Sequence, residues 1–159
     1  MRTLLRGTGF ALAAYLACTA ANASAPVDYS KRAAKLDSAM EASLVGRWTN
    51  PSDNLIITID SVDLVSGRIS GIVQPTSGPA AADGHELSGW ISAAPARDGQ
   101  DNVLPIVFTT TLYEYGTLPA WAGFLKDGTI HTMLYLVWPN KTYRWDHISA
   151  SSEVWTKLP

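Results

Sequence analysis

The side chains that could carry out covalent or metal chemistry are few and scattered along the chain. The three histidines, His85, His131 and His147, lie on separate predicted elements and lack the spacing of metal ligands. His147 belongs to an Asp-His-Ile-Ser run at 146–149, but neighbouring residues on a strand or turn diverge, and the sequence has no Gly-x-Ser-x-Gly nucleophile elbow. It has no glycine-rich phosphate loop either. The sequence therefore predicts no enzyme, no metal site and no cofactor, and we expect the histidines at the surface or at an interface.

Two other polar residues suit the binding of a ligand. Glu153 lies two residues before Trp155 in a predicted strand, so alternation places both side chains on one face. If Trp155 is buried, Glu153 is inside with it, where a carboxylate needs a partner; the alternative is an outward-facing strand residue. Asn50 opens the run Asn-Pro-Ser-Asp-Asn at 50–54, whose composition also favours a turn that the asparagine caps. Both interpretations of each residue stay open.

The elements that must position these residues are predicted to be strands. From Val45 onward, short segments rich in Val, Ile, Thr, Trp and Tyr alternate with turn clusters such as Asp127-Gly128, which favour hairpins. An all-β domain with eight consecutive antiparallel strands predicts an up-and-down β-barrel, which can hold one small ligand. A two-sheet sandwich of lectin or immunoglobulin type is the competing architecture. The strands are expected at 45–50, 54–60, 67–74, 86–92, 103–111, 119–126, 129–138 and 149–157.

Residues 1–25 have the layout of a secretory signal. Arg2 and Arg6 precede an apolar run from Gly9 to Cys18, and small residues follow up to Ala25. The run is shorter than the ~20 apolar residues that a membrane-spanning helix needs, and no second run follows. We therefore expect no membrane span and a secreted or periplasmic protein. The single cysteine lies inside the signal, so the mature protein is expected to have no disulfides.

The mature chain is predicted to have a short lead-in and one domain. Residues 26–43 form the lead-in, which is expected to be a short helix or a loose segment. Leu36 and Met40, together with Leu44 just after the lead-in, have the four-residue spacing of a helix. Residues 44–159 form the barrel domain.

The composition excludes two broad classes of protein. Apolar residue types make up 47% of the 159 residues and charged types only 16%, which is typical of a folded domain and not of a disordered chain. The formal charge is −2, and it becomes −4 once the two arginines of the signal are removed. Because nucleic-acid binding needs clustered Lys and Arg to neutralise phosphates, we expect no nucleic-acid partner.

One predicted strand departs from simple alternation. Met133 to Trp138 are apolar at six consecutive positions, so both faces of this strand should be shielded from water. One face of a strand in a small barrel points inward. We expect the other face to meet a partner subunit or the lead-in, and the pattern therefore predicts a homo-oligomer.

Five short motifs occur in the order found in one known family. They are Gly46-Arg47-Trp48-Thr49-Asn50, Ser70-Gly71, Leu87-Ser88-Gly89, Trp121-Ala122-Gly123 and Trp155-Thr156-Lys157. With these motifs the chain resembles, from about Leu44 to Leu158, the avidin and streptavidin family of biotin-binding barrels. The resemblance implies an eight-stranded antiparallel barrel without catalytic activity, secreted, assembled as a homotetramer or homodimer, with a site for biotin or a related ligand at one end.

The resemblance also implies roles for individual polar residues. Asn50 corresponds to a donor to the ureido oxygen of biotin, and Asn54, or Ser52 if the loop shifts, corresponds to the serine that joins it. Glu153 corresponds to the acceptor of a ureido N–H. Thr117 is placed near the carboxylate end of the ligand.

Three tryptophans match aromatic positions of the family. Trp121 corresponds to a wall of the ligand site on the sixth strand, and Trp145 to the tryptophan that a neighbouring subunit contributes. For Trp145, packing within its own loop is an equally open alternative. Trp48 corresponds to the buried tryptophan at the floor of the barrel, where its main role is expected to be packing.

The sequence departs from the family at several of these positions. Val73 replaces a tyrosine that donates to the ureido oxygen, Leu134 replaces a wall tryptophan, and Pro119 replaces a threonine; the fifth strand has no tryptophan. Tyr113 and Tyr115 are candidates for rebuilding part of the wall. These departures predict weaker binding of biotin than in the tightest family members.

Three functions are consistent with the sequence. The first is a secreted protein that binds biotin or a related small cyclic ligand. The second is the same barrel with a different ligand, or with none and a scaffold role as an oligomer. The third is a carbohydrate-binding sandwich with an exposed aromatic platform.

Overall fold

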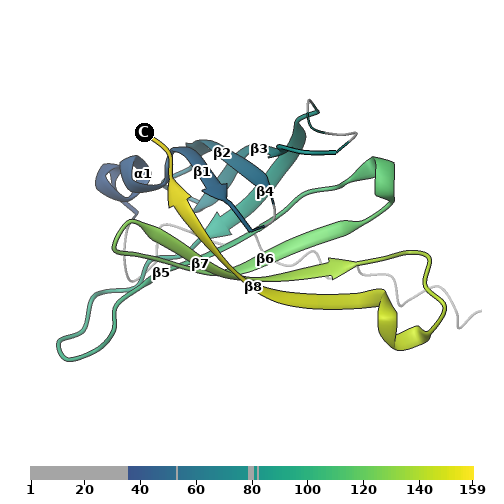
Figure 1. Ribbon diagram of the computed structural model, residues 1–159. Coiled ribbons are helices and arrows are strands. Elements are labelled where there is room, and N and C mark those ends of the chain that lie inside the picture. Colours follow the sequence, from purple (N-terminus) through teal and green to yellow (C-terminus); the bar gives the residue numbers. More distant parts are fainter. Residues whose placement is uncertain (1–35, 53, 79–80, 82) are drawn as a thin grey trace, which may run out of the picture.

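The computed structural model describes residues 36–52, 54–78, 81 and 83–159, and most of its regular secondary structure is β-strand (Figure 1). The predicted signal at 1–25 and the first ten residues of the lead-in lie outside the described residues. The helices and strands are α1 (Ser38–Leu44), β1 (Gly46–Asn50), β2 (Leu55–Val62), β3 (Arg68–Pro75), β4 (His85–Ile91), β5 (Leu104–Thr109), η2 (Tyr113–Tyr115), β6 (Leu118–Lys126), β7 (Thr129–Val137), η3 (Arg144–His147) and β8 (Ile148–Lys157).

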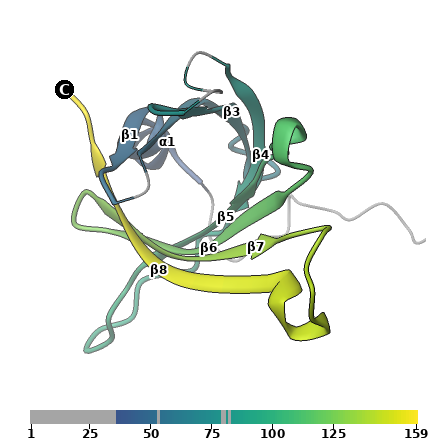
Figure 2. The same ribbon diagram turned by 45° about the vertical axis from the view of Figure 1, so that its right-hand side comes forward.

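The eight strands form one closed antiparallel barrel in the order β1 to β8, with each strand next to its sequence neighbours (Figure 2). Every predicted strand is present, with ends that differ from the prediction by at most two residues. The barrel closes where β1 pairs with β8, through Trp48 opposite Lys157 and Thr49 opposite Thr156. The prediction of an up-and-down barrel is confirmed, and the two-sheet sandwich is wrong because closure leaves one continuous sheet.

Hairpin turns connect the strands as the sequence predicts. The turn between β6 and β7 has two residues, and both Asp127 (φ 49°) and Gly128 (φ 75°) have positive φ angles. Two successive residues of this kind match the right-handed twist of the flanking strands. The Asp-Gly pair therefore sets the register of the hairpin of β6 and β7.

Three glycines within the strands allow the sheet to curve tightly. Gly71, Gly89 and Gly123 lie within β3, β4 and β6, and a Cβ atom there would lie 1.9, 2.2 and 1.8 Å from a backbone carbonyl oxygen of the neighbouring strand. No side chain fits at such a distance. Glycine at these positions lets adjacent backbones approach each other, which a small barrel requires.

Helix α1 closes one end of the barrel. Its N-cap is Asp37, whose carboxylate accepts from the amide of Met40 at 2.9 Å. Leu36 and Leu44 are buried, and Met40 packs against the core. Met40 and Leu44 lie in the helix as their spacing predicts, whereas Leu36 precedes the N-cap and is not helical.

Two hydrogen-bonded contacts join the C-terminal turn of α1 to the barrel. The indole of Trp48, which is fully buried, donates to the carbonyl oxygen of Leu44 at 2.8 Å. The Nζ atom of Lys157 donates to the carbonyl oxygens of Ala42 and Ser43 at 2.9 and 3.1 Å. A cation at this position also suits the partial negative charge of a helix C-terminus. Trp48 therefore has the packing role expected of it.

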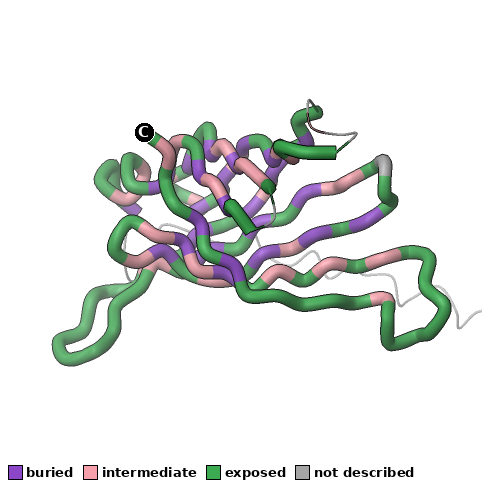
Figure 3. The backbone as a smooth tube through the Cα atoms, in the orientation of Figure 1, coloured by how far each residue is buried: buried purple, intermediate pink, exposed green. Residues whose placement is uncertain are grey.

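The hairpin of β7 and β8 extends beyond the rest of the barrel (Figure 1). The first half of β8, from Ile148 to Ser152, pairs with β7 and is exposed, whereas the second half lines the core. Figure 3 shows this contrast, with buried positions gathered in the barrel and exposed ones along the hairpin. Among the described residues, no helix is long and apolar enough to cross a membrane.

The outward face of β7 is uncovered in the single chain. Met133, Tyr135 and Val137 point outward and are 39%, 46% and 43% exposed. Helix α1 lies at the end of the barrel, beside β1 and β2, and does not cover the outward face of β7 (Figure 1). The six-residue apolar run therefore keeps one face exposed within the described part of the chain.

Candidate ligand-binding site

Polar side chains are buried inside the barrel, mostly toward the end remote from α1. Asn50 ends β1, His85 begins β4, Thr110 follows β5 and Thr117 precedes β6, and each of these positions is at the far end of its strand from the helix. The buried polar residues of the described chain are Asn50, His85, Thr110, Thr117, Thr132 and Glu153. Because buried polar groups cost free energy unless hydrogen-bonded, such a group of them is a candidate site.

Three buried aromatic rings form the apolar part of the site. Phe108 stacks on Trp121 with ring centroids 5.1 Å apart, and Trp155 meets both rings edge-on at 6.0 and 5.9 Å. The three side chains are at most 1% exposed. Phe108 was not predicted as a wall residue, because the family resemblance implies a tryptophan on the fifth strand and this strand has none. Its place in the alternating pattern of β5 was the signal that could have identified it.

Hydrogen bonds connect these aromatic rings to buried polar residues. The indole Nε1 of Trp121 donates to Oε2 of Glu153 at 2.7 Å. The indole Nε1 of Trp155 donates to Oγ1 of Thr132 at 3.1 Å. Thr132 lies directly opposite Glu153 in the ladder of β7 and β8, so the two bonds lie side by side.

Glu153 therefore faces the interior together with Trp155, as alternation predicts. It is 4% exposed, and the outward-facing alternative is wrong. A carboxylate has two acceptor oxygens and can accept several hydrogen bonds. Glu153 can thus accept an N–H group of a ligand in addition to the indole of Trp121.

Asn50 combines both of the roles considered for it. Its Oδ1 accepts from the backbone amide of Ser52 at 3.0 Å, so the turn-capping interpretation is confirmed. The Asn50 side chain is also buried, only 1% exposed, at the end of β1 that is remote from α1. Its role toward a ligand stays a prediction.

The structure does not bring the two other predicted loop residues to the interior. Ser52 and Asn54 are exposed in the turn between β1 and β2. Asn54 has a left-handed conformation (φ 52°), and its carbonyl oxygen accepts from the amide and the hydroxyl of Thr76 at 2.7 and 2.9 Å. Asn54 therefore serves the packing of the turn against the loop after β3.

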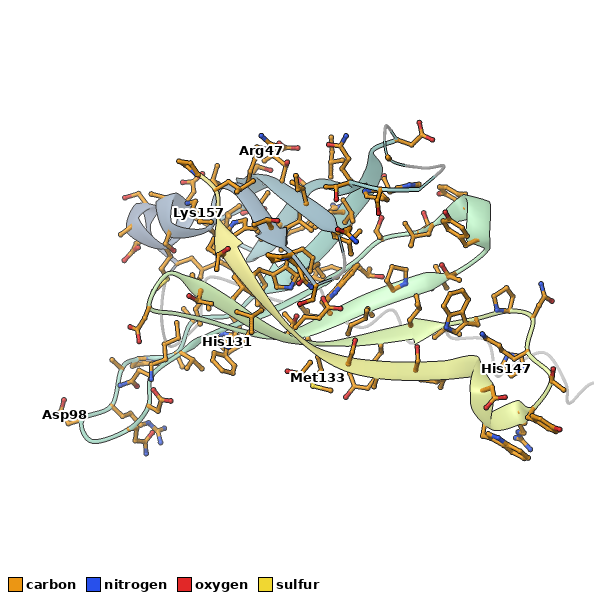
Figure 4. All side chains as sticks on the ribbon, viewed as in Figure 1. Arg47, Asp98, His131, Met133, His147 and Lys157 are labelled. Carbon is orange, nitrogen blue, oxygen red and sulfur yellow. The ribbon has the colours of Figure 1, made fainter. Side chains whose placement is uncertain are left out.

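Thr117 and Trp145 lie in different surroundings. Thr117 is 2% exposed and forms a bridge with Leu112 just before β6, next to the candidate site. Trp145 is 75% exposed on η3, where its ring stacks on Tyr143 at 5.0 Å. Figure 4 shows the neighbouring His147 at the tip of the hairpin, far from Lys157 at the closed end. Trp145 therefore does not contact the interior of its own barrel.

The residues that depart from the family pattern lie at inward positions. Val73 is fully buried, Pro119 is buried, and Leu134 packs against the core. The proposed replacement of the wall is wrong, because Tyr113 and Tyr115 are 79% and 48% exposed. Apolar aliphatic groups, and not new aromatic rings, therefore form this part of the interior.

His85 is a buried residue that sequence reasoning assigned to the surface. It is 5% exposed and begins β4 on the inward face, so this expectation is wrong. Its alternation with Leu87 was the available signal. His131 stacks on Phe124 at 5.2 Å on the outside of the barrel, and His147 bonds the carbonyl oxygen of Trp138 through Nδ1 at 2.7 Å. Within the described ranges, no group of three His, Cys, Asp or Glu residues could hold a metal ion.

Fold and site together define a small closed barrel with a partly polar interior, the kind of barrel that can hold one small ligand. The model of the Avidin family matches residues 38–158, and the chain belongs to this family. Comparison with curated sequences gave no match.

Solved structures show the same fold at low sequence identity. Core-bradavidin is 20% identical, with a TM-score of 0.59 over 70% of this chain and 97% of its own. A biotin-binding protein from chicken is 20% identical, with a TM-score of 0.58 over 74% and 99% of the two chains. A complex of bradavidin2 with biotin is 16% identical, with a TM-score of 0.54 over 71% and 95%.

Proposed function

We propose that this protein binds biotin or a related small cyclic ligand inside its barrel and catalyses no reaction. The observation that carries the proposal is the buried bond between Trp121 and Glu153, which places a hydrogen-bond acceptor beside a cluster of aromatic rings. A flat ring with N–H groups is complementary to such a site, since aromatic faces and an acceptor bind different parts of it. Membership in the Avidin family and the description of two similar proteins as binding biotin support this ligand class.

Asn50 and Thr117 are the other polar residues proposed to contact the ligand. Both are buried next to the end of the barrel that α1 leaves uncovered. Ser52 and Asn54 are exposed and remain candidates only if the turn between β1 and β2 moves on binding.

Binding is proposed to be weaker than in the tightest family members. Val73 and Leu134 are apolar residues at positions where the family has a donor and an aromatic wall, and each lost contact of this kind costs about 2–4 kcal/mol. Losses of this size reduce affinity by several orders of magnitude.

The protein is proposed to be a homodimer or homotetramer. An outward row of residues in ladder register, Trp90, Val107, Ala122 and Met133, crosses four strands without a charged side chain. Trp145 is exposed at the tip of the hairpin, where it could reach the site of a second subunit. The chain is also proposed to be secreted or periplasmic, on the basis of the signal at 1–25.

A second candidate is the same barrel with a different ligand or with a scaffold role alone. The aliphatic Val73 and Leu134 favour it, since they remove contacts that a cyclic urea would use. The carbohydrate-binding sandwich is not retained, because the sheet is a closed barrel.

Calorimetry and thermal unfolding with biotin test the proposal. With ~100 μM biotin we expect a binding heat and a higher melting temperature, since a ligand that binds only the folded state stabilises it. Glu153→Gln keeps an acceptor for Trp121 but removes the charge, and should weaken binding about tenfold or more. Glu86→Gln, an exposed carboxylate on β4, is the matched control and should bind like the wild type. Absence of both heat and thermal shift in the wild type would overturn the proposal.

A further inference from the structure

His85 occupies an inward position that no role described above explains. In β4 the side chains of His85, Leu87 and Ile91 alternate with exposed ones and are buried. His85 is 5% exposed. It lies directly opposite Val73 in the ladder of β3 and β4, and Val73 has no hydrogen-bonding group. On this wall of the barrel, His85 therefore carries the polar function.

The ladder registers place His85 across the interior from Glu153. β4 and β8 are four strands apart in a closed ring of eight, so they lie on opposite walls. If the paired residues are followed from strand to strand through β7, β6 and β5, Glu153 on β8 leads to Ile91 on β4. Through β1, β2 and β3, the register leads from Lys157 to His85. Glu153 lies four residues before Lys157, so the same offset, continued beyond the paired residues, reaches position 81.

The two routes end ten residues apart because barrel strands are tilted and their registers are staggered. The residue of β4 that lies at the same height along the barrel axis as Glu153 is the one midway between the end points of the two routes, which is Glu86. Glu86 points outward, and His85 is its inward-facing neighbour, only about 3.3 Å along the strand. A carboxylate and an imidazole therefore face each other at nearly the same height in the barrel.

We propose that His85 is a second hydrogen-bonding wall of the ligand site and accepts an N–H group of the ligand on the side opposite Glu153. The inference rests on the proposed function and specifies its ligand class: a small ring with two N–H groups that point away from each other, as in a cyclic urea. A neutral imidazole has one acceptor nitrogen, and a carboxylate accepts only. The interior of an eight-stranded barrel has the width of one small ligand, so one ring can bridge both walls.

This arrangement distinguishes ligands by their hydrogen-bonding pattern. A ring with N–H groups on both sides satisfies Glu153 and His85 together. A ring with a single N–H group leaves one of these buried polar residues without a ligand contact. Such a ring should therefore bind with lower affinity than a ring with two N–H groups.

Substitution of His85 tests the proposal by its effect on biotin affinity. His85→Phe fills the same space without an acceptor and should weaken binding about tenfold, the factor expected for one hydrogen bond. His85→Gln keeps an acceptor oxygen and should stay within about threefold of the wild type. Thermal unfolding of both variants verifies that the barrel is folded.

NMR of the imidazole nitrogens, in tag-free protein with ¹⁵N-labelled histidine, reports contact directly. Saturating biotin should shift the His85 nitrogens, whereas those of His131 and His147 serve as internal controls and should not move. If the wild type binds biotin but His85→Phe binds equally well and the His85 nitrogens do not move, the role of His85 is overturned and the proposed function stands. If the wild type binds no biotin, both are overturned.

Discussion

Two of the buried polar residues inside this barrel accept a hydrogen bond from a tryptophan. Trp121 donates to Glu153, and Trp155 donates to Thr132, so each buried indole N–H has an acceptor. If an acceptor is removed, the buried N–H donor is left without a hydrogen bond, and the free energy of unfolding falls by the full desolvation cost of that donor. Removing an exposed hydroxyl changes the free energy of unfolding little. The site is therefore also part of the stable core.

Thr132→Val tests this coupling. The substitution keeps the shape of the side chain but leaves the indole N–H of Trp155 without its acceptor, so the free energy of unfolding should fall by about 1–3 kcal/mol. Urea denaturation measures the change. Thr156→Val, an exposed threonine on β8, is the control and should stay within about 0.5 kcal/mol of the wild type. Equal stability of Thr132→Val and the control would contradict the account of this bond.

At the scale of elements, sequence patterns predicted the strands because local rules determine them. Alternation and Gly-containing turns set the strand positions, and the spacing of Leu36, Met40 and Leu44 predicted α1. The site was predicted less completely. Alternation placed Glu153 inside, but its bond with Trp121 depends on the registers of β6, β7 and β8 together. His85 was assigned to the surface, and it lies just before the strand predicted at 86–92, whereas β4 begins at His85 and buries its side chain.

The turn between β2 and β3 provides a pH-dependent prediction. The pKa of Asp63 is lowered, mainly by the hydrogen bond from the amide of Val65 to its Oδ1 at 2.8 Å and also by the amide of Ser66 at 3.2 Å. A carboxyl whose pKa is lower in the folded state stabilises the fold above its unfolded pKa. This contribution is lost as the pH falls through the lowered value.

We therefore expect Asp63→Ala to unfold at a lower temperature than the wild type at neutral pH. The difference should shrink as the pH falls below the ordinary range of an aspartate and disappear at the acidic end, as measured by thermal unfolding at several pH values. Asp60→Ala, an exposed neighbour on β2, is the control. A difference that grows toward acid pH would contradict this interpretation of the turn.

The glycines within the strands give a second prediction about elements. Gly123→Ala places a Cβ 1.8 Å from the carbonyl oxygen of His131, so β6 and β7 must separate and stability should fall by about 3 kcal/mol or more. Gly128→Ala meets no atom within 4 Å and bears only the strain of its positive φ, about 1–2 kcal/mol. Chemical denaturation of the two variants should rank them in this order. The reverse order would contradict the role of Gly123 in barrel curvature.

At the scale of the whole molecule, the exposed apolar face of β7 suggests that the single chain is not the functional unit. Large contiguous apolar surfaces on folded proteins mark interaction sites. Assembly would also explain why Trp145 is exposed, since a tryptophan at the tip of a hairpin has no partner site on its own barrel. The contact of Trp145 with a second subunit, which the family resemblance implies, stays a prediction.

Tyr135→Glu tests the assembly. Tyr135 is 46% exposed at the centre of this face, and a charge there should favour the monomer, which sedimentation equilibrium detects as a lower mass. Ile72→Glu is the matched control, since Ile72 is 43% exposed on β3, away from β7. A wild-type protein that is monomeric at micromolar concentration would contradict the proposed oligomer.

A crystal structure of the mature protein soaked with biotin tests the central claim most directly. The account predicts one biotin in each barrel, with a ureido N–H donating to the Glu153 carboxylate at about 2.7–3.0 Å and the bicyclic ring against Trp121. Empty barrels at saturating biotin, or biotin bound only outside the barrel, would contradict it.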